Sequence, residues 1–127
     1  MLAMETLIRL AWALLALVHV LPAAVLVAPS LTQRLYGVAP QGDPGVLLIH
    51  RGALFLAVVA VCAYAAIEPG ARRAASLVVA ISVVGFLAVY ARAGFPDGAL
   101  RTIAIYDAVA LLPLAVTLIA AWRPQGA

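Results

Sequence analysis

Hydrophobic residues dominate four long stretches of the chain, and polar or turn-forming residues separate them. The apolar stretches cover about residues 5–28, 46–67, 73–92 and 100–122, and each is close to the ~20 residues that a membrane-spanning helix needs. They are rich in Ala and Leu, and they are too long and too uniformly apolar for the alternating strands of a membrane barrel. The pattern predicts an all-α fold, an integral membrane antiparallel four-helix bundle, as one domain over residues 1–127.

The breaks between the apolar stretches carry turn-forming sequences. EPGARR at 68–73 and AGFPDGALR at 93–101 contain Pro-Gly and Pro-Asp-Gly, which are typical of tight turns. Such short connections make consecutive helices antiparallel neighbours. The longest connection, PSLTQRLYGVAPQGDPG at 29–45, predicts a brief helix that is capped by Ser30 and ended by Gly37.

Composition supports a membrane location. Of the 127 residues, 67% are hydrophobic and 10% are charged, whereas soluble domains average about 45–50% and 25%. The net charge of +3 is carried by arginine, since the chain has no lysine. The arginines are spread over the helix ends, which is typical of interfacial anchoring and not of a nucleic-acid surface. A single cysteine, Cys62, excludes an intramolecular disulfide and dithiol redox chemistry.

Both termini are expected on the same side of the membrane, because four helices cross it. Four arginines fall on that side and four on the other, so the raw count is a tie. Two of the latter, Arg51 and Arg92, fall within the expected helices, and the positive-inside rule concerns arginines in loops. Leaving these two out favours the side of the termini, so we expect both termini in the cytoplasm.

A histidine and an arginine stand side by side in the second apolar stretch, at His50 and Arg51. The expected helix starts near Gly45, so the pair lies ~7–9 Å inside it at 1.5 Å per residue. This depth corresponds to the hydrocarbon boundary on the side away from the termini, where an arginine can extend its charge toward the headgroups. One interpretation is an interfacial anchor, and the other is the wall of a polar pocket.

Polar residues of the other helices fall in the same half of the membrane. Asp107 lies ~10 Å into the fourth helix, and a lone carboxylate at that depth should face the bundle interior and find a partner. We expect His50, Arg51 or Arg92 as that partner, directly or through one water. An ion pair that only fixes the helix register is the alternative. The candidate ligand-binding residues are His19, Tyr90, Arg92, Tyr106 and Trp12.

Helical spacing predicts which face of each helix points inward. Each expected inward face combines small residues, which allow helices to approach closely, with at least one polar group. The four faces are Trp12, Ala16, His19 and Ala23; His50, Ala53, Ala57, Ala60 and Tyr64; Ser82, Gly85, Val89 and Arg92; and Ile103, Asp107, Ala110, Leu114 and Thr117.

Acid–base chemistry on a lipophilic molecule is the chemistry that these side chains can support. As candidate catalytic residues, His50 can move a proton, Asp107 can hold the imidazole or act as a base, and Arg51 can stabilise an enolate or alkoxide. We therefore expect binding, and in the stronger hypothesis conversion, of a lipid, a quinone or an isoprenoid-like molecule. The alternatives are a non-catalytic accessory or structural membrane subunit and a small transporter acting as an oligomer. Whether the chain is an enzyme stays open.

No metal or cofactor is expected. The chain has only two histidines, His19 and His50, which excludes a three-histidine zinc site. Two histidines can ligate a haem axially, but a compact four-helix unit gives it little room. The expected partners are membrane lipids, a lipophilic small molecule or quinone, and a second copy of the chain or a larger membrane complex, without nucleic acid.

Three short features carry a likeness to a known group. They are RLYGV at 34–38, HRGALF at 50–55, and the early aspartate of the fourth helix, Asp107. On these, the chain resembles the small bacterial four-helix membrane proteins of the DoxX-like group, in particular a branch often named phosphopantetheine adenylyltransferase. The H-x-G-H signature of that soluble enzyme does not occur here. The resemblance implies the bacterial inner (cytoplasmic) membrane and, because the group includes subunits linked to quinone-dependent oxidation, adds weight to a quinone or lipid ligand.

Overall fold

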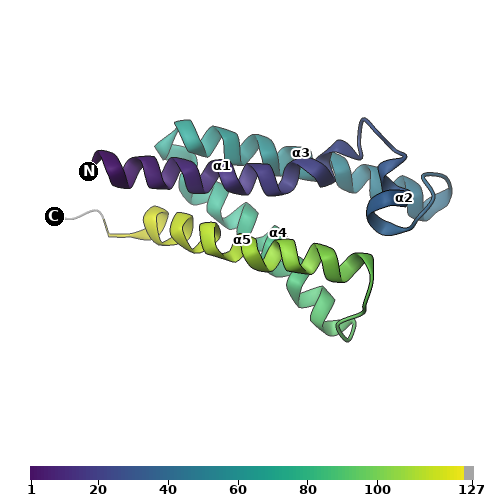
Figure 1. The fold of residues 1–127 in the computed structure, drawn as a ribbon. Coiled ribbons are helices and arrows are strands. Elements are labelled where there is room, and N and C mark those ends of the chain that lie inside the picture. Colours follow the sequence, from purple (N-terminus) through teal and green to yellow (C-terminus); the bar gives the residue numbers. More distant parts are fainter. Residues whose placement is uncertain (125–127) are drawn as a thin grey trace.

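A computed structural model of the chain describes residues 1–124 and consists of helices joined by turns. The four long helices are α1 (Leu2–Ala24), α3 (Gly42–Ile67), α4 (Arg72–Arg92) and α5 (Ala99–Trp122). A short helix, α2 (Leu31–Tyr36), lies between α1 and α3, and one 3-10 turn, η1 (Pro69–Ala71), leads into α4. Residues 1–124 contain no strand. The all-α four-helix bundle expected from the sequence is confirmed (Figure 1).

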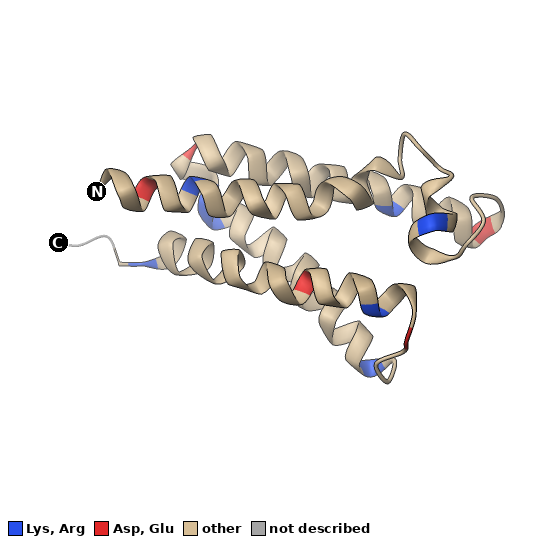
Figure 2. Ribbon diagram, viewed as in Figure 1, with Lys and Arg blue, Asp and Glu red and all other residues tan. Residues whose placement is uncertain are grey.

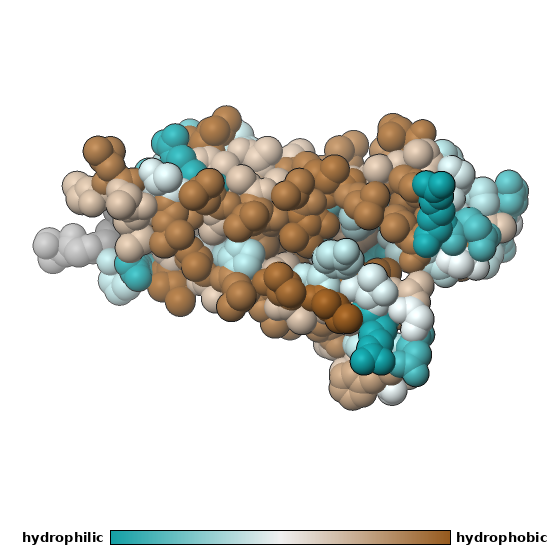
Figure 3. Space-filling view, in the orientation of Figure 1, coloured by the Kyte–Doolittle hydropathy of each residue, from teal (hydrophilic) through white to brown (hydrophobic). Residues whose placement is uncertain are grey.

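Four helices are long and apolar enough to cross a membrane: Leu2–Ala24, Gly42–Ile67, Pro69–Arg92 and Ala99–Trp122. Between 17% and 28% of the residues in their apolar stretches are buried inside the bundle, so lipid has to cover the rest. Hydrophobic residues cover most of the length of the bundle in Figure 3, and hydrophilic residues gather toward its ends. Figure 2 shows the charged positions near the helix ends, with one acidic position part-way along α5. The chain is a multi-pass membrane protein.

The helices associate mainly as two pairs. α1 packs most extensively against α3, α4 packs against α5, and α1 joins the pairs by packing against α5. α3 and α4 follow each other in the chain but make few contacts, because they diverge from the η1 turn (Figure 1). Both termini lie at the end of the bundle opposite α2 (Figure 1). The backbones of α3 and α4 are therefore closer together near η1 than on the side of α2 (Figure 1).

The core is narrow and its closest helix contact depends on glycine. Trp12, Leu15, Val79 and Leu114 are among the largest fully buried side chains of the core. At Gly52 of α3 a Cβ atom would lie 2.8 Å from the backbone nitrogen of Leu26, a distance that a real side chain does not tolerate. The absence of a side chain here allows α3 to approach the end of α1.

A buried ion pair joins the helices at the end that holds the termini. Arg72 of α4 donates from both terminal nitrogens to the Glu5 carboxylate of α1, at 3.0 and 2.7 Å, and its Nε donates to the carbonyl of Ala65 in α3 at 2.9 Å. The Arg72 side chain is 10% exposed. Arg9 donates to the same carboxylate at 2.9 Å. Three helices are therefore fixed in register at this end.

A second set of polar contacts joins α4 and α5 at the same end. Arg73 donates to the carbonyl of Ala121 at 3.0 Å, and its guanidinium lies 5.3 Å from the centre of the Trp122 ring. The indole of Trp122 in turn donates to the hydroxyl of Ser76 at 3.0 Å. No salt bridge joins α3 to α4 at the opposite end of the bundle within residues 1–124.

Two helix boundaries differ most from the sequence prediction, while α1 also begins slightly earlier than expected, at Leu2. α1 ends at Ala24 and not near residue 28, because Val25, Leu26 and Val27 donate to carbonyls three residues earlier and form a tighter turn. α3 begins at Gly42 and not near residue 45, because Pro44 is tolerated in the first turn of a helix, where its missing N–H has no partner to lose.

The short helix α2 matches its predicted ends but not its predicted cap. Gly37 ends it in the left-handed conformation, with φ 68°, as the sequence predicts. Ser30 occupies the N-cap position but makes no side-chain capping hydrogen bond, so that part of the prediction is wrong. α2 contacts both α3 and α5 and lies over the end of the bundle where α3 and α4 diverge (Figure 1).

Candidate functional site

Arg51 lies among three aromatic rings from three helices. Its guanidinium carbon is 4.6 Å from the centre of the Phe55 ring in α3, 5.5 Å from Tyr36 in α2 and 5.7 Å from Phe86 in α4. Aromatic faces attract a guanidinium, and the attraction is stronger away from water. Burial raises the pKa of the Tyr36 phenol, and the positive charge of Arg51 partly opposes that rise. We call these four side chains the Arg51 cluster.

The Arg51 cluster leaves most of the donor groups of the guanidinium free. Arg51 is half-buried and forms no salt bridge within residues 1–124, and the Tyr36 hydroxyl is the hydrogen-bonding group beside it. A guanidinium carries five N–H donors in its plane, and aromatic rings interact with its faces. The interpretation of Arg51 as a purely interfacial anchor does not account for its three aromatic neighbours.

His19 extends the cluster to α1. Its side chain is buried, and the His19 and Phe55 rings lie 5.6 Å apart at an angle of 34°. The Nδ1 atom lies 2.7 Å from the carbonyl oxygen of Leu15, and because a carbonyl only accepts, Nδ1 carries a proton. In the neutral ring, Nε2 is then the acceptor atom. His19 lies on the predicted inward face of α1, together with Trp12, Ala16 and Ala23, and that prediction is confirmed.

Asp107 faces the bundle but has no direct partner among the described residues. It is half-buried on α5, on the same face as the buried residues Ala110, Leu114 and Thr117, so the predicted inward face of α5 is confirmed. Arg51 is the charged group within Coulombic range of its carboxylate, yet no salt bridge joins the two. The expected direct contact with His50, Arg51 or Arg92 is absent from residues 1–124. A cation and a carboxylate thus face each other without touching.

His50 points away from the site, which corrects the predicted inward face of α3. His50, Ala57, Ala60 and Tyr64 are exposed. The buried residues of α3 are instead Gly45, Gly52, Val58, Cys62 and Ala65. Small residues occur on both sides of this helix, so the sequence pattern selected the wrong one. His50 and Arg51, adjacent in the chain, therefore diverge by about 100° around the helix axis, and only Arg51 joins the aromatic rings.

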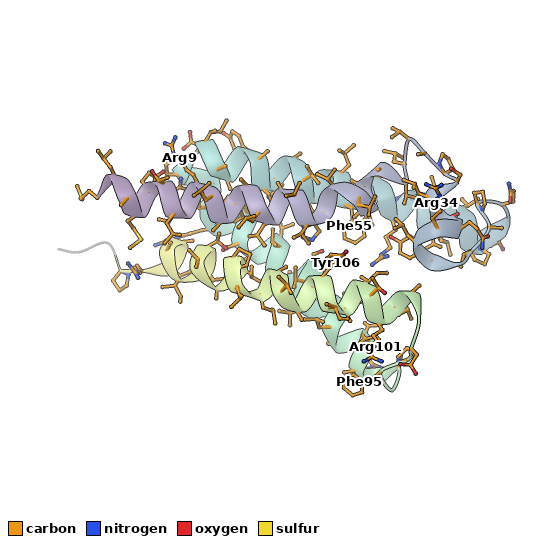
Figure 4. All side chains as sticks on the ribbon, in the orientation of Figure 1. Arg9, Arg34, Phe55, Phe95, Arg101 and Tyr106 are labelled. Carbon is orange, nitrogen blue, oxygen red and sulfur yellow. The ribbon has the colours of Figure 1, made fainter. Side chains whose placement is uncertain are left out.

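The remaining candidate residues are dispersed. Trp12 is fully buried in the core, and its indole nitrogen has no hydrogen-bond partner within the described residues. Tyr90 donates to the carbonyl of Pro96 at 2.9 Å and stacks on Phe86 at 6.3 Å. Arg92 is exposed as the last residue of α4. Tyr106 is 63% exposed on α5, and Figure 4 shows it and Phe55 pointing into the space between the two helix pairs.

A groove between α3 and α4 leads from the Arg51 cluster along the bundle. Its volume is ≈ 380 Å³, and the lining includes Arg51, Phe55, Val58, Ser82, Gly85 and Phe86. Apart from Arg51 and Ser82, its lining residues are apolar or glycine. Both lining stretches belong to candidate membrane spans, so the groove opens toward acyl chains. The predicted inward face of α4 lines this groove at Ser82, Gly85 and Val89, while Arg92 does not.

Sequence reasoning missed the aromatic part of the site. The spacing of Arg51 and Phe55, one helical turn apart, is a usable signal because side chains at i and i+4 are neighbours. Tyr36 and Phe86 gave no such signal, since they reach Arg51 from other helices. Within residues 1–124, no three His, Cys, Asp or Glu side chains gather as a group that could hold a metal ion.

The arrangement of these side chains is better suited to binding an amphiphile than to catalysis. It combines an apolar groove, a cation and a carboxylate on a neighbouring helix, but no salt bridge joins the candidate catalytic side chains His50, Arg51 and Asp107 in the described part of the chain. Comparisons with family models, with curated proteins and with solved structures found no match.

Proposed function

We propose that this membrane protein binds a lipophilic small molecule, such as a lipid, a quinone or an isoprenoid-like compound, in the groove between α3 and α4. The observation that carries the proposal is the groove itself, which is apolar along its length and ends at the free donors of Arg51. Its volume of ≈ 380 Å³ falls in the range of small-molecule sites. The DoxX-like resemblance, the bacterial inner membrane and cytoplasmic termini belong to the same proposal.

The groove is placed so that a ligand can enter from the membrane. It lies between two helices that make few contacts with each other, and its lining residues fall inside candidate spans. A molecule dissolved in the acyl chains can therefore reach Arg51 without crossing water or opening the core. A single bound ligand would then take the place of the lipid tails that otherwise fill the groove.

Binding is better supported than a purely structural role for the polar residues. An ion pair that fixes helix register does exist, but it joins Glu5 and Arg72 at the other end of the bundle. Arg51 and Asp107 remain separate. Conversion of the ligand would use Asp107 as the acidic or basic group, with Arg51 stabilising negative charge, and it is the narrower part of the proposal.

The test is native mass spectrometry of the protein extracted gently from its host membrane. Gly85 is the residue to change, because a Cβ atom there meets no atom within 4 Å and a Leu side chain would fill the groove. We expect a bound lipophilic molecule on the wild type and several-fold less of it on Gly85→Leu. Ala88→Leu is the matched control, because Ala88 is exposed on the same helix and does not line the groove. Equal occupancy in all three proteins would contradict the proposal.

A further inference from the structure

Arg51 carries information about the ligand that the groove alone does not. Three aromatic rings approach its guanidinium carbon, while no carboxylate within residues 1–124 forms a salt bridge with it. An arginine within a membrane span is usually paired. The missing element is therefore an acceptor that lies in the plane of the guanidinium.

We propose that the ligand is a membrane amphiphile with an oxyanion head group, a phosphate or a carboxylate, bound by Arg51, and with an apolar chain lying along the groove. This inference rests on the proposed function and specifies the chemical class of the ligand. A phosphate or carboxylate accepts two parallel hydrogen bonds from a guanidinium and also cancels its charge. A quinone carbonyl or an alcohol accepts hydrogen bonds but brings no negative charge into contact with the guanidinium.

The shape of the groove suits a chain. Its lining extends from Arg51 to Val58 on α3 and from Val78 to Val89 on α4, which corresponds to ~10 Å and ~16 Å at 1.5 Å per residue. The end opposite Arg51 is lined by apolar side chains. An elongated apolar lining with one cation at its end matches a molecule with a single polar end.

Asp107 determines on which side of Arg51 the head group binds. The carboxylate lies on α5 and is not part of the groove lining, although it is within Coulombic range of the guanidinium. Its negative charge disfavours a second anion between α5 and Arg51. The oxyanion is therefore expected on the groove side of the guanidinium, where Phe55 and Phe86 lie and no carboxylate lines the wall.

The experiment compares two probes that share one chain, oleyl phosphate and oleyl alcohol, by equilibrium binding to the full-length protein in a non-ionic detergent. On the wild type we expect oleyl phosphate to bind at least tenfold more tightly than oleyl alcohol. Arg51→Met should remove this preference, because it should weaken oleyl phosphate binding far more than oleyl alcohol binding. Arg51→Lys, which keeps the charge but not the planar pair of donors, should retain part of it. Gly85→Leu should weaken both probes, and Ala88→Leu should weaken neither.

The outcomes separate this inference from the proposed function. If both probes bind the wild type equally and Gly85→Leu weakens both, the groove binds a neutral lipophile and the oxyanion inference is overturned. If Gly85→Leu weakens neither probe, the groove is not the binding site and both proposals are overturned. The comparison of the probes on the wild type decides the inference even when Arg51→Met does not fold.

Discussion

The guanidinium carbon of Arg51 lies 4.6 Å from the centre of the Phe55 ring, one helical turn further along α3. The same ring lies 5.6 Å from the His19 ring of α1. Phe55 thus connects a charged group at the end of the groove with a histidine buried in the neighbouring helix. An attraction between a cation and an aromatic face contributes about 0.5–2 kcal/mol, with the larger values away from water.

Replacement of Phe55 by Leu should uncouple Arg51 from the bundle. In a double-mutant cycle of Phe55→Leu and Arg51→Met, measured by unfolding in detergent, we expect a coupling free energy of about 0.5–2 kcal/mol. The control cycle uses Phe95→Leu with Arg51→Met, since Phe95 packs on Tyr90 at the α4–α5 turn and not on Arg51. A coupling indistinguishable from that of the control would mean that the ring does not hold the cation.

The Glu5–Arg72 ion pair should matter more than its exposed neighbour. Glu5→Gln leaves the Arg72 side chain, which is 10% exposed, without a negative partner, and unpaired buried charge destabilises strongly. We expect a clear fall in melting temperature. Arg9→Gln removes only the contact within α1, whose arginine side chain is 55% exposed, and should change the melting temperature little. Equal effects of the two substitutions would show that the bridge between helices adds nothing.

Two glycines should respond in opposite ways to the same added methyl group. Gly52→Ala places a Cβ atom 2.8 Å from the backbone nitrogen of Leu26 and should destabilise by about 1–3 kcal/mol through overpacking. Gly85→Ala meets no atom within 4 Å and should be neutral or stabilising by about 0.5–1 kcal/mol, because Gly is a poor helix former. Denaturant unfolding of both variants checks this, and a tolerated Gly52→Ala would contradict the close approach of α1 and α3.

Asp107→Asn should leave the fold intact and alter binding. No ion pair is lost within residues 1–124, and a neutral amide is easier to keep away from water than a carboxylate. We therefore expect unchanged or raised stability and a few-fold tighter binding of oleyl phosphate, since a negative charge near Arg51 is removed. Asp97→Asn, which breaks only the exposed pair with Arg101, is the control. A loss of more than ~2 kcal/mol in Asp107→Asn would restore the register interpretation.

The turns at residues 37–41 and 93–98 should be reached from the opposite side of the membrane to the η1 turn. Asp43→Cys and Asp97→Cys should react with a membrane-impermeant maleimide from one side, and Glu68→Cys from the other. All three positions are exposed, and the wild-type control should not react because Cys62 is fully buried. Labelling of Asp43→Cys and Asp97→Cys in intact cells would place the termini in the cytoplasm. Labelling of all three from one side would contradict four spans.

Much of the fold follows from local properties of the sequence. Length and apolarity define four spans, and Pro-Gly and Pro-Asp-Gly place two of the turns. The inward faces of α1 and α5 could be predicted. On α1, His19 aligns with the small residues Ala16 and Ala23, and on α5, Asp107 aligns with Ala110. α3 could not be assigned in this way, because Ala53, Ala57 and Ala60 make its outer side as small as its inner side.

The candidate site could be predicted only in part, because it depends on contacts between helices that the sequence does not reveal. Arg51 was identified from its depth, but its neighbours Tyr36 and Phe86 are set by the divergence of α4 from α3 and by the position of α2 (Figure 1). The prediction that His50 and Arg51 line the same pocket was wrong for His50, which is exposed. Adjacent residues of a helix face different directions. The direct contact expected for Asp107 is absent from residues 1–124, and the prediction of a contact through one water stays a prediction.

The weak contact between α3 and α4 bears on how the protein is assembled in the membrane. Most helix contacts form within α1–α3 and within α4–α5, so the first 67 residues and the segment from Arg72 onward each make a helical hairpin with its own packed seam. We expect the α1–α3 hairpin to pack before α4 and α5 are synthesised. A chain interrupted at the η1 turn should therefore reassemble from two co-expressed halves, with Glu5 and Arg72 as the recognition pair.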